Sequence, residues 1–261
     1  MDIKILKFNC KKFFIKHKNR VYKFFIVNNL YKKEASFSRE AQDIIIKPFY
    51  FKKFFNKFVL KIEPFANKFS YNDLEQVFKL IDCLKKIHTT KINNYFLKND
   101  YLDNNQKYSP ENIWSSLFNK KVLLTFKKPD IKKIESVKGG LLKKASDVID
   151  GQTILIHGDL NPSNILVFKD KVKIIDWEDA RQDNPFLDIA QTIFYAQKNK
   201  KESEKMLKRY NKNKSIEELL YFIFLNVLWC LIHKKEYKLY KKVVNFWIKE
   251  IKEFNFLEKN T

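Results

Sequence analysis

The fold of this chain is decided by two short stretches, HGDLNPSN at residues 157–164 and IIDWE at residues 174–178. Asn164 follows Asp159 by five positions, and Asp176 follows Asn164 by twelve. Phosphoryl transfer from ATP needs these groups. One carboxylate orients and deprotonates the attacking hydroxyl, while an amide oxygen and a second carboxylate hold the Mg²⁺ that bridges the phosphates. The two stretches therefore predict a phosphoryl-transfer site.

A simpler interpretation is that these polar residues only shape a turn, which Pro162 and Asn161 would suit. The order and spacing of the three residues argue against it, as do the β-rich runs at residues 153–156, 165–168 and 172–175. A strand, a loop and a hairpin are also the setting of the protein-kinase motif H-R-D-L-x-x-x-N and its downstream metal-binding Asp. Gly158 replaces the Arg here. The context favours the catalytic interpretation.

The composition is that of a folded globular protein. The chain has 261 residues, 45% of them hydrophobic, which suffices for a core in one large domain or a two-lobed unit. We expect no targeting segment, because charge interrupts the N-terminus from Asp2 onward. The near-apolar run at residues 219–232 is too short to span a membrane, so we expect a buried helix there and no membrane insertion. Three widely spaced cysteines indicate a reducing cytoplasm.

The net charge of +22 raises the possibility of nucleic-acid binding. Only four of the 52 basic residues are arginine, however, and readers of phosphates and base edges favour arginine for its bidentate fork. The lysines are spread through every segment and are not clustered. Their abundance, together with that of Asn, Ile and Phe, resembles a bias of the whole amino-acid composition. We therefore expect no nucleic-acid partner.

The pattern along the chain predicts an α+β fold with two lobes. Strand-like runs at residues 12–16 and 20–27 form a hairpin, and two further strands are expected near residues 49–51 and 58–62. Ser38 is a candidate helix N-cap between them. From Ser70, a second candidate N-cap, the chain is mostly helical. The first helix has its apolar positions on one face: Leu74, Val77, Phe78, Ile81, Leu84 and Ile87. We predict a small β-rich lobe over residues 1–64 and a larger helical lobe over residues 65–261.

These features resemble the choline/ethanolamine kinase family within the aminoglycoside phosphotransferase superfamily, whose members share the two-lobed protein-kinase-like fold. The similarity covers most of the chain. Residues 157–166 resemble the superfamily's catalytic loop, and residues 175–178 and 184–190 are similar to the bacterial choline-kinase branch. Residues 39–41 resemble the start of the helix that carries the glutamate paired with the nucleotide-binding lysine.

The resemblance implies a role for each matching residue. Asp159 is implied to be the catalytic base, and Asn164 and Asp176 the Mg²⁺ ligands, whose oxygens suit this hard cation. Asp188 is implied to brace the catalytic loop. His157 is expected to support the loop and not to shuttle protons, because a carboxylate already performs the acid–base task.

A lysine on a strand of the first lobe is implied to contact the ATP phosphates. Lys23 is the candidate, paired with Glu40, and Lys16 is its rival. The chain also departs from the kinase pattern in the placement of its glycines, because none of the four lies in the first 130 residues. A glycine-rich phosphate loop is therefore absent from the sequence.

The acceptor pocket of the choline branch combines acidic residues with aromatic faces, because a quaternary ammonium is bound by cation–π contacts and diffuse negative charge. Glu178, Asp179 and Trp229 are the candidates here, although core packing is an equal explanation for Trp229. Asp179 stands where that branch usually has Tyr, and Ile232 stands where it often has a second Trp. Fewer aromatic faces and more carboxylate suit a smaller or more hydrated amine such as ethanolamine, or an amino sugar.

The sequence thus predicts a cytoplasmic kinase that uses ATP and Mg²⁺ to phosphorylate the hydroxyl of a cationic amino-alcohol, choline or ethanolamine. An aminoglycoside, an amino sugar or thiamine is the alternative acceptor. A pseudokinase that binds nucleotide without turnover is an alternative of another class, favoured by the missing glycine loop and opposed by the intact Asp159, Asn164 and Asp176. The choice between ATP and GTP and the oligomeric state stay open at this point.

Overall fold

We describe the protein from a computed structural model. The structure describes residues 3–8, 12–26, 50–54, 58–64, 66–89, 154–196, 199–232 and 234–258. The predicted helix that begins at Ser38 lies outside these residues. The chain divides into two compact units: residues 1–98 with 157–181, and residues 99–156 with 182–261. We describe each unit by itself. The predicted lobe boundary between residues 64 and 65 stays a prediction.

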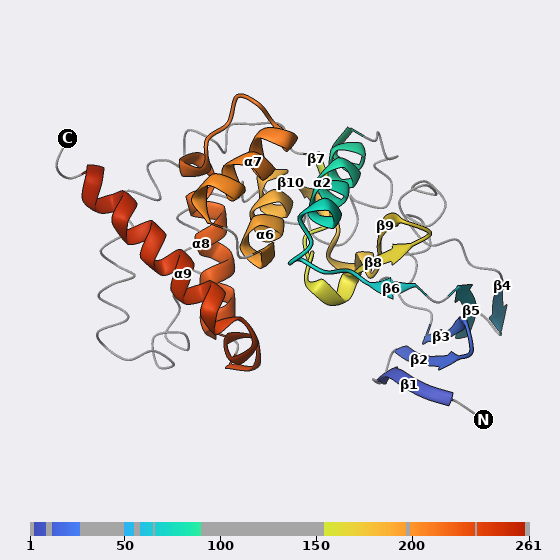
Figure 1. Ribbon diagram of the computed structural model, residues 1–261. Coiled ribbons are helices and arrows are strands. Elements are labelled where there is room, and N and C mark those ends of the chain that lie inside the picture. Colours follow the sequence, from blue (N-terminus) through green and yellow to red (C-terminus); the bar gives the residue numbers. More distant parts are fainter. Residues whose placement is uncertain are drawn as a thin grey trace. The chain divides into compact units, whose positions relative to one another are not determined.

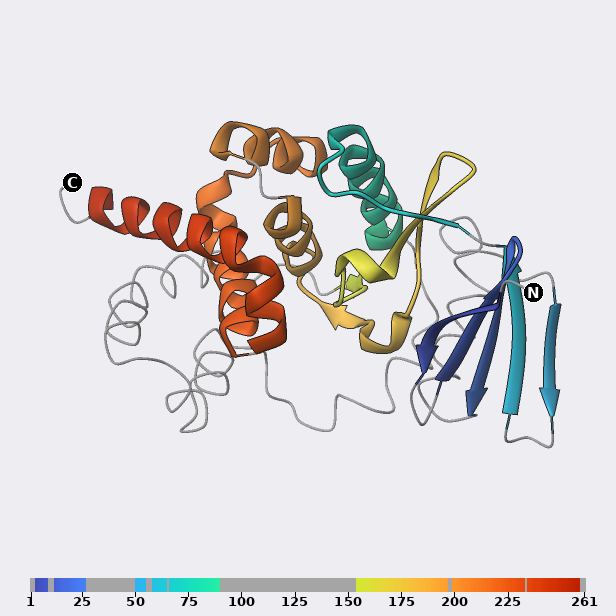
Figure 2. The same cartoon turned by 60° about the horizontal axis from the view of Figure 1, so that its bottom comes forward.

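The first unit opens with a five-stranded antiparallel sheet in the order β1-β2-β3-β5-β4 (Figures 1 and 2). Its strands are β1 (Ile3–Phe8), β2 (Lys12–His17), β3 (Arg20–Ile26), β4 (Tyr50–Phe54) and β5 (Phe58–Pro64). The predicted hairpin is confirmed. Lys18, with a φ of 51°, helps form the tight turn between β2 and β3, where left-handed residues match the twist of the strands.

The same unit continues with a helix and a second small sheet. Helix α2 (Leu74–Thr89) packs on β9 (Lys171–Ile174), which pairs with β8 (Ile165–Phe168) and through it with β6 (Asn67–Lys68). The buried face of α2 contains four of the predicted apolar positions and also Leu80: Val77, Leu80, Ile81, Leu84 and Ile87. Two short 3₁₀ turns flank the β8–β9 hairpin, η1 (Pro162–Asn164) and η2 (Trp177–Asp179).

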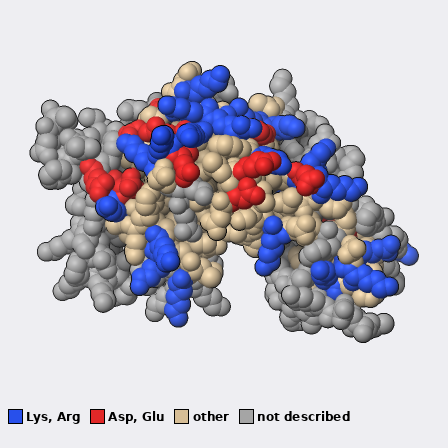
Figure 3. Space-filling view, viewed as in Figure 1, with Lys and Arg blue, Asp and Glu red and all other residues tan. Residues whose placement is uncertain are grey.

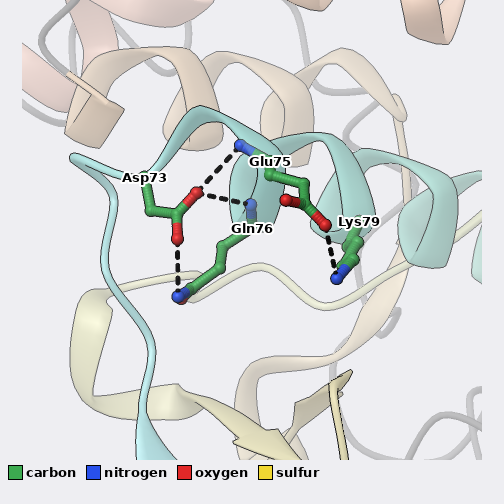
Figure 4. Close-up of polar contacts among 4 residues, drawn as sticks. All are labelled: Asp73, Glu75, Gln76 and Lys79. Carbon is green, nitrogen blue, oxygen red and sulfur yellow. Dashed lines mark hydrogen bonds and ion pairs between the residues drawn. The ribbon is translucent and has the colours of Figure 1, made fainter.

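Helix α2 begins later than predicted, because Asp73 and not Ser70 is its N-cap (Figure 4). The Asp73 Oδ1 atom accepts the backbone N–H groups of Glu75 at 3.0 Å and Gln76 at 3.2 Å. The Gln76 side chain donates to Asp73 Oδ2 at 2.9 Å. A carboxylate at this point satisfies otherwise orphaned donors and complements the helix dipole. Ser70 instead donates its backbone N–H to Gln76 Oε1.

The second unit is mostly helical. Strands β7 (Ile154–Ile156) and β10 (Arg181–Asp183) pair where the two units join in sequence. The helices are α6 (Phe186–Ala196), α7 (Lys200–Tyr210), α8 (Ile216–Ile232) and α9 (Lys234–Glu258). Helix α8 packs against the other three, so the predicted buried helix is confirmed (Figure 1). Among the described residues, no helix is long and apolar enough to cross a membrane.

Candidate active site

Residues 157–164, which we call the HGD loop, are anchored by a completely buried His157. Its Nδ1 atom accepts the backbone N–H of Asp159 at 3.2 Å, so Nε2 carries the proton donated to the carbonyl oxygen of Ile175 at 3.1 Å. The ring of Trp177 meets the imidazole edge-on, with centroids 4.8 Å apart. The Nδ1 atom thus fixes the shape of the loop itself, and the Nε2 atom ties the loop to the strand end that leads to Asp176.

Gly158 is required by a close approach within the loop. Its φ is +81°, a conformation that side chains rarely adopt. A Cβ atom at this position would lie 2.8 Å from the backbone oxygen of Asp179 and 2.6 Å from Nη1 of Arg181. That Nη1 atom donates to the same Asp179 oxygen at 3.3 Å. The glycine therefore lets the HGD loop pack directly on η2.

Two amides hold the carboxylate of Asp159. Asn161 donates from Nδ2 to both carboxylate oxygens, at 3.0 and 2.8 Å, and Asn164 donates from Nδ2 to Oδ2 at 2.8 Å. The Asn161 Oδ1 atom accepts the backbone N–H and the hydroxyl of Ser163, as expected for the residue that caps η1. The buried Tyr71 hydroxyl fixes the loop from outside, donating to the carbonyl oxygen of Leu160 at 2.7 Å. The orientation of the Asp159 carboxylate is thus set by the loop itself.

Asp176 and Asn164 stand beside each other at the base of the β8–β9 hairpin. Ile165 pairs with Ile174, and the next rung joins the Asn164 carbonyl oxygen to the Ile175 N–H at 2.9 Å. Asp176 follows with φ 63° and ψ 61°. This left-handed conformation is uncommon for a non-glycine residue, and such strain concentrates at functional sites.

The donor set at this point fits a magnesium ion. Mg²⁺ is bound by one or two protein carboxylates and by substrate phosphates, and it keeps several waters. The Asn164 amide nitrogen is engaged by Asp159, so its Oδ1 atom, which also accepts the Ser163 hydroxyl at 3.5 Å, would be the cation ligand. The half-buried Asp176 would supply the carboxylate.

Lys23 lies on the inner face of the five-stranded sheet and pairs with a residue that the sequence did not indicate. Its Nζ atom lies 2.6 Å from Oε2 of Glu63, and the Nζ atom of Lys61 lies 2.6 Å from Oε1 of the same carboxylate. Glu40, the predicted partner of Lys23, lies outside the described residues. Lys16, the rival candidate, is half-buried on β2. The sequence signal for Lys61 and Glu63 was their alternation with apolar residues along β5.

Glu63 remains ionised despite its burial. Burial by itself raises the pKa of this carboxyl, but the charges and hydrogen bonds of Lys23 and Lys61 outweigh it and hold the pKa below its ordinary value. The three side chains therefore form a charged cluster, which we call the β3–β5 triad (Lys23, Lys61 and Glu63).

Asp188 lies in the second unit, in the first turn of α6, and is completely buried. A carboxylate there is favoured by the helix dipole. Burial raises the pKa of Tyr210, and the negative charge of Asp188 raises it further. The bracing role expected for Asp188 stays a prediction.

The predicted acceptor residues lie on different elements. Glu178 and Asp179 belong to η2, and Trp229 belongs to α8 in the other unit. Asp179 is exposed. The side chains of Glu178 and Trp229 lie outside the described part of the structure. The acceptor pocket therefore stays a prediction.

Solved structures share the fold of this chain. A mutant aminoglycoside 2'-phosphotransferase-IIIa in its GDP complex matches with a TM-score of 0.69 and 12% identity, covering 98% of this chain and 92% of that one. Choline kinase LicA from Streptococcus pneumoniae matches at 0.63 and 17%, covering 97% and 94%. An ethanolamine kinase from Plasmodium vivax matches at 0.58 and 17%, covering 88% and 76%. These similarities confirm the predicted α+β protein-kinase-like fold.

Sequence comparison identifies the family. No curated protein matches the chain. The family model described as "Phosphotransferase enzyme family" matches residues 62–215, more than half of the chain, and includes the HGD loop, both hairpin strands and Asp176. The chain therefore belongs to this phosphotransferase family, which is the superfamily that its sequence motifs resemble.

Proposed function

We propose that this phosphotransferase moves the γ-phosphoryl group of ATP to the hydroxyl of a small amino-alcohol, choline or ethanolamine. The observation that carries the proposal is the carboxylate of Asp159, held by Asn161 and Asn164 beside the hairpin base at Asp176. A carboxylate fixed in this way is ready to accept a proton without reorienting, and positioning supplies much of the catalysis in phosphoryl transfer.

In the proposed reaction, Asp159 accepts the hydroxyl proton of the acceptor as the hydroxyl oxygen attacks the γ-phosphorus. The bond from that phosphorus to the bridging oxygen breaks, and ADP leaves. Asn164 and Asp176 would hold Mg²⁺, which neutralises charge developing on the phosphates. Lys23 would contact the phosphates, and His157 and Asp188 would keep the loop in place. The intact Asp159, Asn164 and Asp176 argue against a pseudokinase.

The proteins of similar structure support a nucleotide and a small acceptor. They include a choline kinase, a choline/ethanolamine kinase family protein from Mesorhizobium loti and an ethanolamine kinase. They also include aminoglycoside phosphotransferases, one with ADP and one with AMP-PNP and hygromycin B. An aminoglycoside is therefore the second candidate acceptor. We place the reaction in the cytoplasm, where the free thiols of Cys83 and Cys230 suit reducing conditions.

The experiment is an ADP-release assay with MgATP or MgGTP over a panel of acceptors. The panel contains choline, ethanolamine, an aminoglycoside, an amino sugar, thiamine and a neutral diol. Turnover with choline or ethanolamine above the others supports the proposal. Turnover only with the aminoglycoside moves the protein to the second candidate. Release of no ADP with any acceptor, although MgATP raises the melting temperature, supports the pseudokinase.

A further inference from the structure

The buried face of the five-stranded sheet mixes charged side chains with the apolar Val21 and Val59. On its inner face Lys23, Lys61 and Glu63 are 6%, 6% and 3% exposed. On its outer face Phe24 is 40% exposed and Phe58 is 51% exposed. Burying charges while exposing phenylalanine opposes stability, because buried ion pairs are on average no better than apolar residues of similar size. The arrangement therefore points to a function for the inner face.

The strand register explains how the triad forms. Lys23 of β3 lies directly opposite Lys61 of β5, and Glu63 lies two residues further along β5 on the same face. One carboxylate thus reaches both ammonium groups, each at 2.6 Å through a different oxygen. The Lys23 Nζ atom also lies 5.3 Å from the centre of the Phe14 ring, which limits its position from the β2 side.

We propose that Lys61 is a second phosphate-binding lysine, which acts with Lys23 on the nucleotide phosphates, and that Glu63 is the residue that positions both. The proposal rests on the proposed use of ATP. Two ammonium groups gathered by one carboxylate present several N–H donors together, as an oligophosphate requires. Because Glu63 belongs to a sheet strand, it would hold Lys23 from within the sheet, whether or not Glu40 also contacts it.

Binding of ATP and of adenosine to the folded protein tests the proposal, since the two ligands differ only in the phosphates. Lys61→Met should raise the Kd for MgATP by about tenfold or more and leave the Kd for adenosine unchanged. The matched control is Lys52→Met on β4. Lys52 pairs with Leu60, so it lies on the outer face, and it is exposed. This control should leave both constants unchanged.

The second variant, Glu63→Gln, remains informative if Lys61→Met does not fold. It should melt at a lower temperature than the wild type, because two buried ammonium groups lose their shared carboxylate. MgATP should then raise its melting temperature by more than it raises that of the wild type, because phosphate oxygens replace the carboxylate. A purely structural triad would give equal shifts in both proteins.

The outcomes separate this proposal from the proposed function. If the wild type does not bind MgATP, both the proposed function and the phosphate-binding role of Lys61 are overturned. If the wild type binds MgATP and Lys61→Met keeps the ratio of the two dissociation constants within twofold, only the role of Lys61 is overturned. Equal MgATP shifts for Glu63→Gln and the wild type would overturn the role of Glu63.

Discussion

At the scale of single residues, the HGD loop concentrates its hydrogen bonds on one carboxylate. Asp159 receives three side-chain N–H contacts from Asn161 and Asn164, and its own N–H is held by His157. With Asp159 as the proposed base, these contacts would fix where a substrate hydroxyl approaches. The role of Asp159 and the roles of the residues that hold it can therefore be tested by separate mutations.

The first prediction concerns Asp159→Asn. The amide keeps the shape of the side chain but cannot accept the acceptor's proton, so kcat should fall by about 10²–10⁴. The Kd for MgATP should stay near that of the wild type. Asp176→Asn should instead weaken the Mg²⁺-dependent binding of ATP. Steady-state kinetics and titrations with and without Mg²⁺ measure the difference, and a wild-type kcat for Asp159→Asn would refute its role as base.

The second prediction concerns Asn161→Ala. Both Asp159 oxygens lose a donor, so the carboxylate is less well oriented and kcat should fall while KM for ATP changes little. Ser163→Ala is the control, because the Asn161 oxygen still accepts the Ser163 backbone N–H at 2.9 Å. It should retain most activity. Equal losses of kcat in the two variants would contradict the orienting role of Asn161, because Ser163→Ala leaves both Asn161 contacts to Asp159 in place.

At the scale of elements, the third prediction concerns the start of α2 (Figure 4). Asp73→Ala removes the acceptor of the Glu75 and Gln76 N–H groups and should lower the free energy of unfolding by about 0.5–2 kcal/mol. Urea denaturation measures this loss. Glu75→Ala is the control, because it removes only an exposed pair with Lys79 and should cost less. A larger loss for Glu75→Ala would contradict the assignment of the cap.

The fourth prediction concerns the pH dependence of the β3–β5 triad. Glu63 has a pKa below its ordinary value of 4.5 in the folded protein, so its ion pairs stabilise the fold above about pH 4.5. That contribution is lost as the pH falls through the lowered folded pKa. Glu63→Gln should therefore cost about 3–5 kcal/mol at pH 7 and show a shallower loss of stability on acidification. Urea midpoints from pH 7 to pH 3 test it, and parallel curves for the two proteins would refute it.

Local sequence patterns predicted some of the helices and strands but not others. Alternation predicted the β2–β3 hairpin, and apolar periodicity predicted the buried face of α2. Strand β1 was not predicted, since an irregularity between Ile5 and Lys7 interrupts the alternation of apolar and charged residues along it. The N-cap of α2 was assigned to Ser70 because serine and aspartate have similar preferences for the N-cap position. Ser70 precedes the true cap, Asp73, by three residues. The β3–β5 triad was missed because the alternating charges of β5 do not show which residue of another strand they face, and that depends on the register between strands.

The site followed the same rule. The HGD loop could be predicted because spacing along one short segment already brings Asp159 and Asn164 together. The pairing of Lys23 with Glu63 could not, because the two residues are distant in sequence and many lysines compete for each carboxylate. Asn161 was noticed only as a turn residue, although its amide reaches both oxygens of Asp159.

At the scale of the whole molecule, the net charge of +22 must be reconciled with the proposed cationic acceptor. Figure 3 shows Lys and Arg side chains in several separate groups, with Asp and Glu between some of them. Long-range attraction from this surface favours anions such as ATP and opposes amines. Selectivity for an amine must therefore come from carboxylates and aromatic faces close to the bound acceptor.

The fifth prediction follows from that requirement. With Glu178 and Asp179 following Asp176 closely in the sequence, amino-alcohols should be phosphorylated far better than a neutral diol of the same size. An aromatic face adds about 0.5–2 kcal/mol of attraction for a quaternary ammonium, depending on its desolvation. Trp229→Ala should thus raise KM more for choline than for ethanolamine, because only choline relies on contact over its methyl groups.

Since Asp179 and Ile232 reduce the aromatic surface, the wild type should show a narrowed or reversed preference for choline over ethanolamine. Values of kcat/KM for choline, ethanolamine and the diol on both proteins decide the matter. Equal losses on all three would assign Trp229 to the core of α8 and remove the choline-type pocket from the proposal.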